Sequence, residues 1–521
     1  MNRIKYFLLF LVLGIAIFFY PMFASGFDLM PGNGHDVKFI SYILEHSWLW
    51  LNKVPTHEYF LTAPFFYPYE NNLAYSDLLV GIMPLYWILR TFLSPFSAIQ
   101  GLVILMCVIN YGVFYYFLRR SLKFSSLASG VGAFLFAFGI LRYFRMPHFN
   151  YYCQFIEILS LIFFLKVNRE NSVVKNHIFF GLGSLFLVLQ FYSCFTLAYF
   201  LCFVVFIGFV VSMFFKDTRK KIIEFVKYFY KYLILWGIVI VALLTPLAVL
   251  YLGVGEVRTI EDVIRYIQGP SAWLRSPSML DYLFMQFVSF QDRFEYRDEI
   301  CASIGVFATI FSLIGIFKLK NMRKIFYPVI AIIFVLSCAF GSFLLWKYLY
   351  PVLIGAQGIR AIIRISLIAL IIFSIGICGF IDKIKNKTVV TLCIILIVIE
   401  QIPMYKSPYL WQNYNWSKSK FQTQIKETSK LFPKDVKIVF LDYNFKDKDS
   451  RTLPFNVLFE NYMYYATLAM WASLDAQKYS INGYSGVVIE QYPNLGNRTI
   501  YYQNYDVDVD KYKESNNLLG K

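Results

Sequence analysis

Hydrophobic residues are gathered into long runs that are separated by short polar and basic segments. The runs that are long enough to cross a bilayer, or nearly so, cover residues 5–24, 77–93, 97–118, 125–143, 151–166, 177–193, 196–215, 232–252, 301–317, 325–342, 364–381 and 388–404. A helix needs about 20 apolar residues to cross the hydrocarbon core of a membrane. The pattern therefore predicts an α-helical polytopic membrane protein with about 11–13 transmembrane helices.

Basic clusters lie between many of these runs and set the expected orientation. They occupy residues 2–5, 119–123, 166–175, 216–221, 318–324 and 383–387. Cytoplasmic loops are rich in Lys and Arg. A cytoplasmic N-terminus and strict alternation after residue 119 place every cluster inside and the C-terminal tail outside.

One segment before residue 119 conflicts with this arrangement. Two full crossings between residues 77 and 118 would place Arg119 and Arg120 outside. The run 77–93 contains Gly81, Pro84 and Arg90, so we expect it to be re-entrant or broken; a missed crossing inside 37–70 is the alternative. The sequence therefore predicts eleven or thirteen true crossings.

Two domains are expected. Residues 1–406 form the transmembrane domain, with extracytoplasmic loops at 25–76 and 253–300. Residues 407–521 form a small extracytoplasmic α/β domain, with helices at 418–431 and 461–476, a strand at 436–441 and a turn-rich loop at 480–486. Amphipathic stretches at 36–51, 257–268 and 273–290 are typical of helices that lie at the membrane interface.

The first run admits two interpretations. The small residues 24–26 resemble the cleavage site of a secretory signal peptide. The run is long and many others follow, so we favour an uncleaved first helix.

Composition agrees with a membrane protein. The 521 residues are 58% hydrophobic and only 16% charged, which is more apolar surface than one soluble core can bury. The net charge is +17, and the Lys and Arg residues that produce it cluster between the apolar runs. The charge therefore reflects topology and not nucleic-acid binding. The eight cysteines lie in or beside apolar stretches and form no disulfide framework or CxxC metal pair.

The first long loop concentrates acidic residues outside the membrane. Asp36, Glu45 and Asp77 are the candidates for chemistry, and Asp36 is best placed because it opens a helix after the flexible segment Pro31-Gly-Asn-Gly34. A partly buried carboxylate there could act as general base toward a hydroxyl group. The alternative for Asp36 and for Asp77 is a helix N-cap.

Arginines occur near the outer ends of apolar runs, where the positive-inside rule does not expect them. They form two pairs at helical spacing, Arg142 with Arg145 and Arg360 with Arg364. Each pair could present two guanidinium groups on one face to a phosphate, which Arg can bind bidentately. His148 could donate to the same anion. The alternative is that these side chains reach toward lipid headgroups.

Metal or cofactor binding has little support in the sequence. The first loop holds His35, His46 and His57, but no motif such as HExxH fixes their spacing. We predict no cofactor; a divalent metal is conceivable without a ligand motif to support it.

The order of several short motifs resembles bacterial polytopic membrane proteins of the GT-C glycosyltransferase superfamily, in their poorly characterised predicted-glycosyltransferase branch. The motifs are Gly-Asn-Gly-His-Asp36, Tyr-Ile-Leu-Glu45-His-Ser-Trp, Phe-Phe-Tyr-Pro68, Leu-Ala-Tyr-Ser-Asp77, Pro-Leu-Tyr86, Asn110-Tyr with Leu-Arg-Arg120, Gly-Ala-Phe-Leu-Phe-Ala-Phe138, Arg142 to His148, Gln-Gly-Ile-Arg360 and Ile-Asn-Gly-Tyr-Ser-Gly486. The resemblance covers most of the chain.

The resemblance implies an inverting hexosyl- or pentosyltransferase in the cell membrane. It would move a sugar from a polyprenyl-phosphate donor to a glycan, lipid or protein acceptor of the cell envelope. A first-loop Asp is the usual catalytic base of that family, and here it corresponds to Asp36. Family members often have paired acids in this loop, whereas here the neighbour of Asp36 is His35.

The implied mechanism gives each candidate a role. Asp36 would deprotonate the acceptor, and the arginines Arg360 and Arg364, with Arg142, would hold the departing lipid phosphate. The remaining substrate-binding candidates are Glu45, Asp77, Arg145, His148 and Gln357.

Two other functions remain open. A non-catalytic transporter or flippase for a polyprenyl-linked glycan would need the arginines but not Asp36. The scarcity of charge in the apolar runs argues against the polar path that such a protein needs. An assembly protein that binds a partner through its tail is the third possibility.

Overall fold

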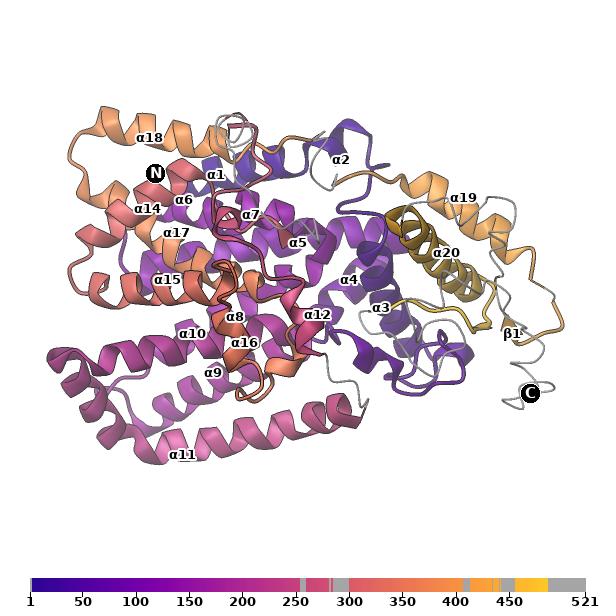
Figure 1. The fold of residues 1–521 in the computed structure, drawn as a ribbon, viewed down its shortest axis with the longest axis horizontal. Helices are drawn as coiled ribbons and strands as arrows, with labels where there is room; N and C mark the ends of the chain where they lie inside the picture. The colour runs from indigo at the N-terminus through magenta and orange to yellow at the C-terminus, as the bar shows by residue number, and fades with distance from the viewer. Residues whose placement is uncertain are drawn as a thin grey trace.

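The computed structural model describes residues 2–253, 259–280, 283, 299–405, 413–432, 434–439, 441 and 455–485. Most of these residues are helical, and the helices of the apolar part run side by side in a bundle (Figure 1). The chain is thus an α-helical protein whose composition and architecture fit a membrane.

Within the described residues, six stretches of helix are long and apolar enough to cross a bilayer. They are Pro95–Ser121 (α5 with the π-helical turn η3), Ser126–Phe144 (α6 and α7), Val173–Ser193 (α9), Phe195–Met213 (α10), Lys216–Gly253 (α11) and Ile362–Lys383 (η8 and α17). Shorter apolar helices accompany them: α1 (Asn2–Phe18), α8 (Phe155–Leu165), α14 (Val306–Lys318), α15 (Arg323–Ser337) and α18 (Lys387–Glu400). Each coincides with one of the hydrophobic runs.

Short helices also occur, and most of them connect the bundle helices; two of them, α7 and η8, are parts of the long stretches named above. They are α2 (Tyr20–Ala24), η1 (Pro55–His57), η2 (Asn72–Tyr75), α7 (Ile140–Phe144), η4 (Met146–Gln154), α12 (Ile260–Ile264), η5 (Pro270–Trp273), α16 (Leu345–Leu349), η7 (Ala356–Gly358) and η8 (Ile362–Ile365). In their described parts, the expected amphipathic stretch 257–268 contains α12, and the stretch 273–290 contains the end of η5 and the helical residues Met279, Leu280 and Leu283.

The run 77–93 is not a continuous span. It holds a loop followed by α4 (Met83–Phe92), a helix of 10 residues with Pro at its start. At 1.5 Å per residue such a helix is about 15 Å long, half the thickness of the hydrocarbon core. The interrupted helix expected for this segment is therefore present.

The centre of the bundle is formed by α6 (Ser126–Phe138) and α17 (Ser366–Lys383), whose residues are almost all buried. Close packing between α14 and α17 depends on small residues. A Cβ added to Gly315 would lie 1.9 Å from the carbonyl oxygen of Gly376, so the two backbones touch directly. Small residues at helix contacts are typical of membrane bundles, where tight packing replaces the hydrophobic driving force.

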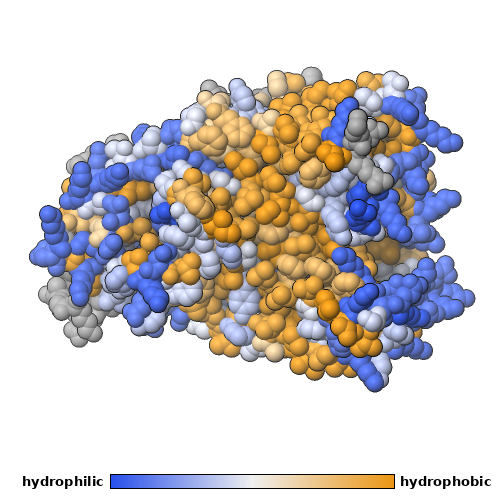
Figure 2. Space-filling model, turned by 180° about the vertical axis from the view of Figure 1, so that it is seen from behind, coloured by the Kyte–Doolittle hydropathy of each residue, from blue (hydrophilic) through white to orange (hydrophobic). Residues whose placement is uncertain are grey.

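The outer surface of the bundle is apolar. The 38-residue helix α11 buries only Phe229 and Leu247 and exposes hydrophobic side chains along much of its length. Figure 2 shows a broad hydrophobic band across this face of the molecule, with hydrophilic surface at both ends. Exposed apolar surface on this scale is compatible with a membrane protein.

The first loop contains the helix that was expected at residues 36–51, and α3 spans Asp36–Leu51. Its environment differs from the expectation, because Val37 to Ser47 are all buried and no half of the helix is left for a membrane surface. The helix contacts α4, η4 and the tail helix α20. The hydrophobic residues of α3 therefore pack against other elements on several sides. Their spacing in the sequence is nevertheless like that of a helix that lies at a membrane surface.

The described part of the tail holds α19 (Lys418–Ser429), α20 (Phe455–Asp475) and the short parallel strands β1 (Ile438–Val439) and β2 (Tyr479–Ser480). These elements pack against the first loop at one end of the bundle (Figure 1). Helix α20 begins six residues before the predicted position 461. Residues 407–412 and 486–521 lie outside the described residues, so the domain division at 406 stays a prediction.

Candidate functional site

Asp36 lies where three distant parts of the chain meet. The turn before it requires Gly32, which has a φ of +79° and leaves no room for a side chain next to Val37. The carboxylate does not cap α3: the N-cap position is His35, and no side chain caps the helix. Instead, Asp36 Oδ1 accepts a hydrogen bond from the Tyr484 hydroxyl at 2.7 Å.

His148 lies between Asp36 and Arg364. Its Nε2 atom is 3.7 Å from Asp36 Oδ2 and 3.3 Å from Arg364 Nη2. Burial and the charges of Arg364, Arg145 and Arg360 hold the pKa of His148 well below its usual value. The imidazole is therefore neutral near pH 7, and its contact with Asp36 is not an ion pair.

The pKa of Asp36 is raised. Burial is the largest cause, whereas the Tyr484 hydroxyl and the positive charges of Arg364 and Arg360 act in the opposite direction. A carboxylate whose proton affinity is raised by its surroundings is better suited to accept a proton than a fully solvated one. The side chain still exposes 26% of its surface, so it can be approached.

Two arginines share one buried carboxylate, Glu299. Arg145 Nη1 donates to Glu299 Oε2 at 2.6 Å, and Arg364 Nε donates to Oε1 at 2.7 Å. Arg364 Nη2 also donates to Glu299 Oε1. Although burial alone would raise the pKa of Glu299, the charges of Arg145 and Arg364 hold it below its usual value. Glu299 is thus an anion that fixes both guanidinium groups.

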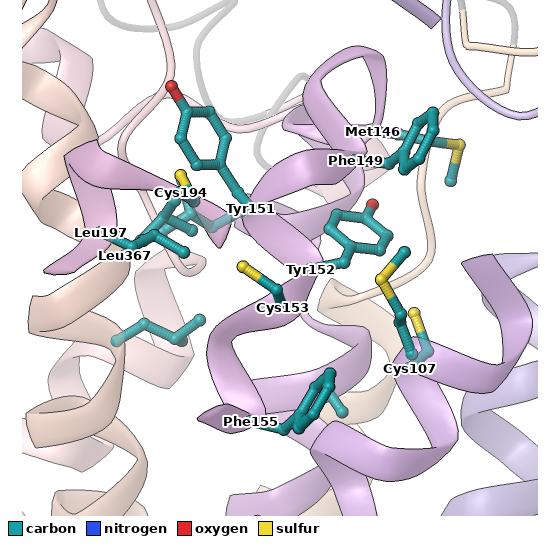
Figure 3. Packing of buried hydrophobic residues seen from close by; sticks show 14 of the residues in the cluster. Cys107, Met146, Phe149, Tyr151, Tyr152, Cys153, Phe155, Cys194, Leu197 and Leu367 are labelled. Carbon is teal, nitrogen blue, oxygen red and sulfur yellow. The ribbon is translucent and has the colours of Figure 1, made fainter. Parts of the chain in front are cut away.

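The segment η4 brings a tyrosine to the same place. Tyr151 accepts a hydrogen bond from Arg364 Nη1, while the next residue, Tyr152, donates to the carbonyl oxygen of Arg142 at 2.8 Å. The two rings project to different sides of the segment (Figure 3). Tyr151 therefore faces the site, and Tyr152 anchors η4 to the bundle.

Asp77 caps a helix, but not the one that follows it. Its Oδ1 accepts from the backbone N–H of Phe195 at 3.0 Å, at the start of α10, and its Oδ2 accepts from Asn150 Nδ2 at 2.6 Å. Burial raises the pKa of Asp77, and the hydrogen bonds and the charge of Arg364 oppose this shift. The alternative that Asp77 caps the segment that follows it in the chain does not hold, because the N-cap residue of α4 is Ile82.

The arginine pairs do not present two groups on one helix face. Arg360 precedes η8 and stacks over the ring of Tyr266 at 4.3 Å, whereas Arg364 lies inside η8 and turns to Glu299. Helix α17 begins only at Ser366. Arg142 and Arg145 also diverge. Arg360 and Arg364 therefore do not share an α-helix, whereas Arg142 lies in the short helix α7 and Arg145 is its C-cap residue.

Glu45 and Gln357 lie in other environments. Glu45 accepts from Arg90 Nε at 2.9 Å and from the Tyr86 hydroxyl at 2.5 Å, which makes a buried ion pair between α3 and α4. Gln357 exchanges two long contacts of 3.4 Å with Tyr350. Both residues are thus engaged in holding loops and helices together.

Arg142 is fully buried inside the bundle. Its guanidinium donates to the carbonyl oxygens of Phe136 and Tyr151 and, at 2.5 Å, to Gln154 Oε1. These bonds tie α6 and η4 together, so we do not place Arg142 among the groups that contact a substrate.

Sequence reasoning missed Glu299 and Tyr484. Glu299 ends a charged segment, Asp-Arg-Phe-Glu-Tyr-Arg-Asp-Glu299, in the second long loop, and the need of the arginines for a counter-ion could have pointed to it. Tyr484 lies in the Ile-Asn-Gly-Tyr-Ser-Gly486 motif, but nothing in a linear pattern joins it to residue 36.

Among the described residues, no group of three or more His, Cys, Asp or Glu side chains could hold a metal ion. His46 and His57 face each other with their Nδ1 atoms 2.7 Å apart, which is a hydrogen bond between neutral rings and too short a separation for joint metal ligation. Use of a metal therefore stays open.

Comparison with known proteins adds no further constraint. No protein-family model matches the chain, and no curated protein is significantly similar to it. The function therefore has to be inferred from the site itself.

Proposed function

We propose that this protein is a membrane glycosyltransferase of GT-C type, which transfers a sugar from a polyprenyl-phosphate donor to a glycan, lipid or protein acceptor. One observation carries the proposal: Asp36, His148 and Arg364 form a continuous chain of contacts at the polar end of an apolar bundle. A base for the acceptor and a cation for a leaving phosphate are the two groups that such a transfer needs.

The topology supports this assignment. Because α4 has only 10 residues and counting it as a crossing would place the basic residues Arg119 and Arg120 outside, we propose that the other eleven hydrophobic runs cross the membrane. Alternation then places every basic cluster in the cytoplasm and both the first loop and the tail outside. Figure 1 shows α3, α4, α19 and α20 at one end of the bundle, as this arrangement requires.

The proposed reaction is a single displacement at the anomeric carbon. Asp36 Oδ2 accepts the proton of the acceptor hydroxyl while the hydroxyl oxygen forms a bond to the anomeric carbon. The bond from that carbon to the phosphate oxygen breaks, and its electron pair stays on the polyprenyl phosphate. Asp36 acquires the proton, and the sugar is transferred with inversion.

Arg364 stabilises the leaving phosphate through its charge. Its N–H groups already donate to Glu299 and Tyr151, so the bidentate grip expected for a phosphate is not the role that we assign to it. A fixed positive charge in a site that excludes water stabilises developing negative charge strongly. Arg360 contributes in the same way, since its charge also acts on Asp36.

The first test is the transfer of labelled sugar from synthetic polyprenyl-phosphate donors into membrane glycans. We expect Asp36→Asn to lower the rate by about 10²- to 10⁴-fold, the usual contribution of a general base. Asp262→Asn is the matched control, because Asp262 lies on the outer helix α12 with Thr259 as its partner. Full activity of Asp36→Asn would refute the assignment of the base.

The wild-type protein decides between function classes in the same assay. Turnover with at least one donor supports an enzyme. If no donor is used by the wild type at any pH, the proposal fails and the transporter, flippase or assembly functions become the better candidates.

A further inference from the structure

The tail reaches back to the candidate base across 448 residues of sequence. The Tyr484 hydroxyl donates to Asp36 Oδ1 at 2.7 Å, and the Tyr484 ring meets the ring of Phe39, one turn further along α3, edge to face at 5.5 Å. The ring contact limits the positions that the hydroxyl can take.

The segment that carries Tyr484 is held on both sides. On one side, Ile481 N–H donates to the carbonyl oxygen of Val439 at 2.9 Å, which continues the pairing of β2 with β1. On the other side, Ser480 N–H donates to the carbonyl oxygen of Pro64 at 2.8 Å, and Tyr67 N–H donates back to that of Ser480 at 2.9 Å. The first loop thus forms a third strand-like edge beside β2.

Contact between this segment and the first loop is very close at Gly483. A Cβ added there would lie 2.3 Å from the ring of Phe66, so only glycine fits. The neighbouring Asn482 side chain exchanges hydrogen bonds of 2.7 and 3.1 Å with the backbone of Leu441. The position of Tyr484 is therefore restrained by the contacts of the residues that precede it.

The tail also contacts α3 close to Asp36. Trp471 Nε1 donates to the carbonyl oxygen of Lys38 at 3.0 Å. The Lys38 side chain points away from Asp36, with Nζ 3.9 Å from the ring centre of Phe421 and 4.7 Å from that of Tyr464. Helices α19 and α20 thus hold the first turn of α3 while Tyr484 holds its carboxylate.

We infer that Tyr484 is a positioning residue for Asp36 and that the described part of the tail therefore completes the site. The inference rests on the proposed function. With Oδ1 bonded to Tyr484, the Oδ2 atom is directed toward His148 and remains the oxygen that can accept a proton from an acceptor hydroxyl.

The bond also favours the ionised form of Asp36, because a hydroxyl donates more strongly to a carboxylate than to a carboxylic acid. Burial opposes ionisation. The charged or titratable groups that face Asp36 from the packed elements are Tyr484, His148, Arg364, Arg360 and Glu299. Tyr484 and His148 carry no formal charge near pH 7, and Tyr484 is the one of the two that donates a hydrogen bond to Asp36 Oδ1.

The test measures the ionisation of Asp36 in the full-length protein by infrared spectroscopy. The protonated-carboxyl band of Asp36 is identified by its loss in Asp36→Asn. In Tyr484→Phe we expect the midpoint of its titration to move upward by about one pH unit, the size of one charge-assisted hydrogen bond. Tyr405→Phe is the matched control, because its hydroxyl donates at 2.6 Å to the carbonyl oxygen of Ile17.

A second variant keeps the test decisive if Tyr484→Phe does not fold. Replacement of Tyr484 by 3-fluorotyrosine keeps the shape and makes the phenol a stronger donor, so the midpoint should move downward. A midpoint unchanged in either variant would overturn the inference, as would an equal shift in Tyr405→Phe.

Activity separates the two proposals. We expect the acidic limb of the pH profile of kcat/KM in Tyr484→Phe to move with the infrared midpoint, and the rate to recover at higher pH. If Tyr484→Phe transfers sugar and the acidic limb of its pH profile does not move, the role of Tyr484 is refuted and the proposed transferase activity is not. Absence of transfer in the wild type together with a shifted infrared midpoint would refute the transferase only.

Discussion

At the scale of single residues, Glu299 fixes the positions of Arg145 and Arg364. It is fully buried and accepts hydrogen bonds from Arg145 and Arg364, so one carboxylate is shared between two positive charges. Burying such charges is costly, and a pair of this kind stabilises the fold only while all partners are present. Its benefit is geometric, because it fixes both arginines beside the site.

We therefore expect Glu299→Gln to lower the free energy of unfolding by about 3–5 kcal/mol, since two guanidinium groups would lose their counter-ion. Chemical denaturation in detergent would measure this, with the exposed Glu261→Gln as control. A midpoint equal to that of the control would contradict the prediction.

The same ion pairs predict how stability depends on pH. The folded state lowers the pKa of Glu299, so its contribution is present above the pKa of the unfolded chain and is lost as the pH falls through the lower folded value. Unfolding followed from pH 7 toward pH 3 should therefore show a loss of stability in the wild type that Glu299→Gln lacks. Parallel curves for the two proteins would exclude this contribution.

At the scale of elements, the contact between α14 and α17 carries the tightest constraint. A Cβ at Gly376 would lie 2.5 Å from the carbonyl oxygen of Ser312, which is backbone and cannot turn aside. Nothing lies within 4 Å of the corresponding position at Gly112 in α5. The two glycines therefore test packing and helix propensity separately.

Gly376→Ala should lower the stability by about 1–3 kcal/mol, because the added methyl group forces the helices apart. Gly112→Ala should leave stability unchanged or raise it by up to about 1 kcal/mol, because Ala favours a helix more than Gly does. Thermal unfolding in detergent would compare them. An equal effect of both changes would show that α14 and α17 are less tightly packed than described.

At the scale of the whole molecule, the short helix α4 decides the sidedness of everything after it. With eleven crossings, the exposed residue Lys385 lies in the cytoplasm and the exposed residue Lys420 in α19 lies outside. Each can be replaced by cysteine in a background where the native cysteines do not react.

We expect a membrane-impermeant maleimide to label Lys420→Cys in intact cells and to label Lys385→Cys only after the membrane is opened. The reverse pattern would place the tail in the cytoplasm and refute the proposed orientation. Labelling of both in intact cells would show that the barrier was not intact.

Much of the fold could be predicted from the sequence. Each hydrophobic run corresponds to a helix or, at 77–93, to the expected interruption, because the length and composition of a helix in lipid are local properties. The bounds of α3 also follow from local signals, the turn before Asp36 and the periodic hydrophobic residues after it.

The site could be predicted only in part. Asp36, His148 and Arg364 were singled out by their unusual positions, and the structure brings them together. The partners of these residues could not be predicted: Glu299 is joined to Arg364 across 65 residues, and Tyr484 is joined to Asp36 across 448 residues. Likewise, the arginine spacing misled because helix α17 begins after Arg364.

The sequence by itself determined that this is a helical protein for a lipid environment, since burial of apolar surface and satisfaction of backbone polar groups act within each segment. Only the tertiary structure decided which polar side chains meet. These contacts depend on how distant helices and loops pack. A buried charged group pairs with the polar group that this packing brings within hydrogen-bond distance.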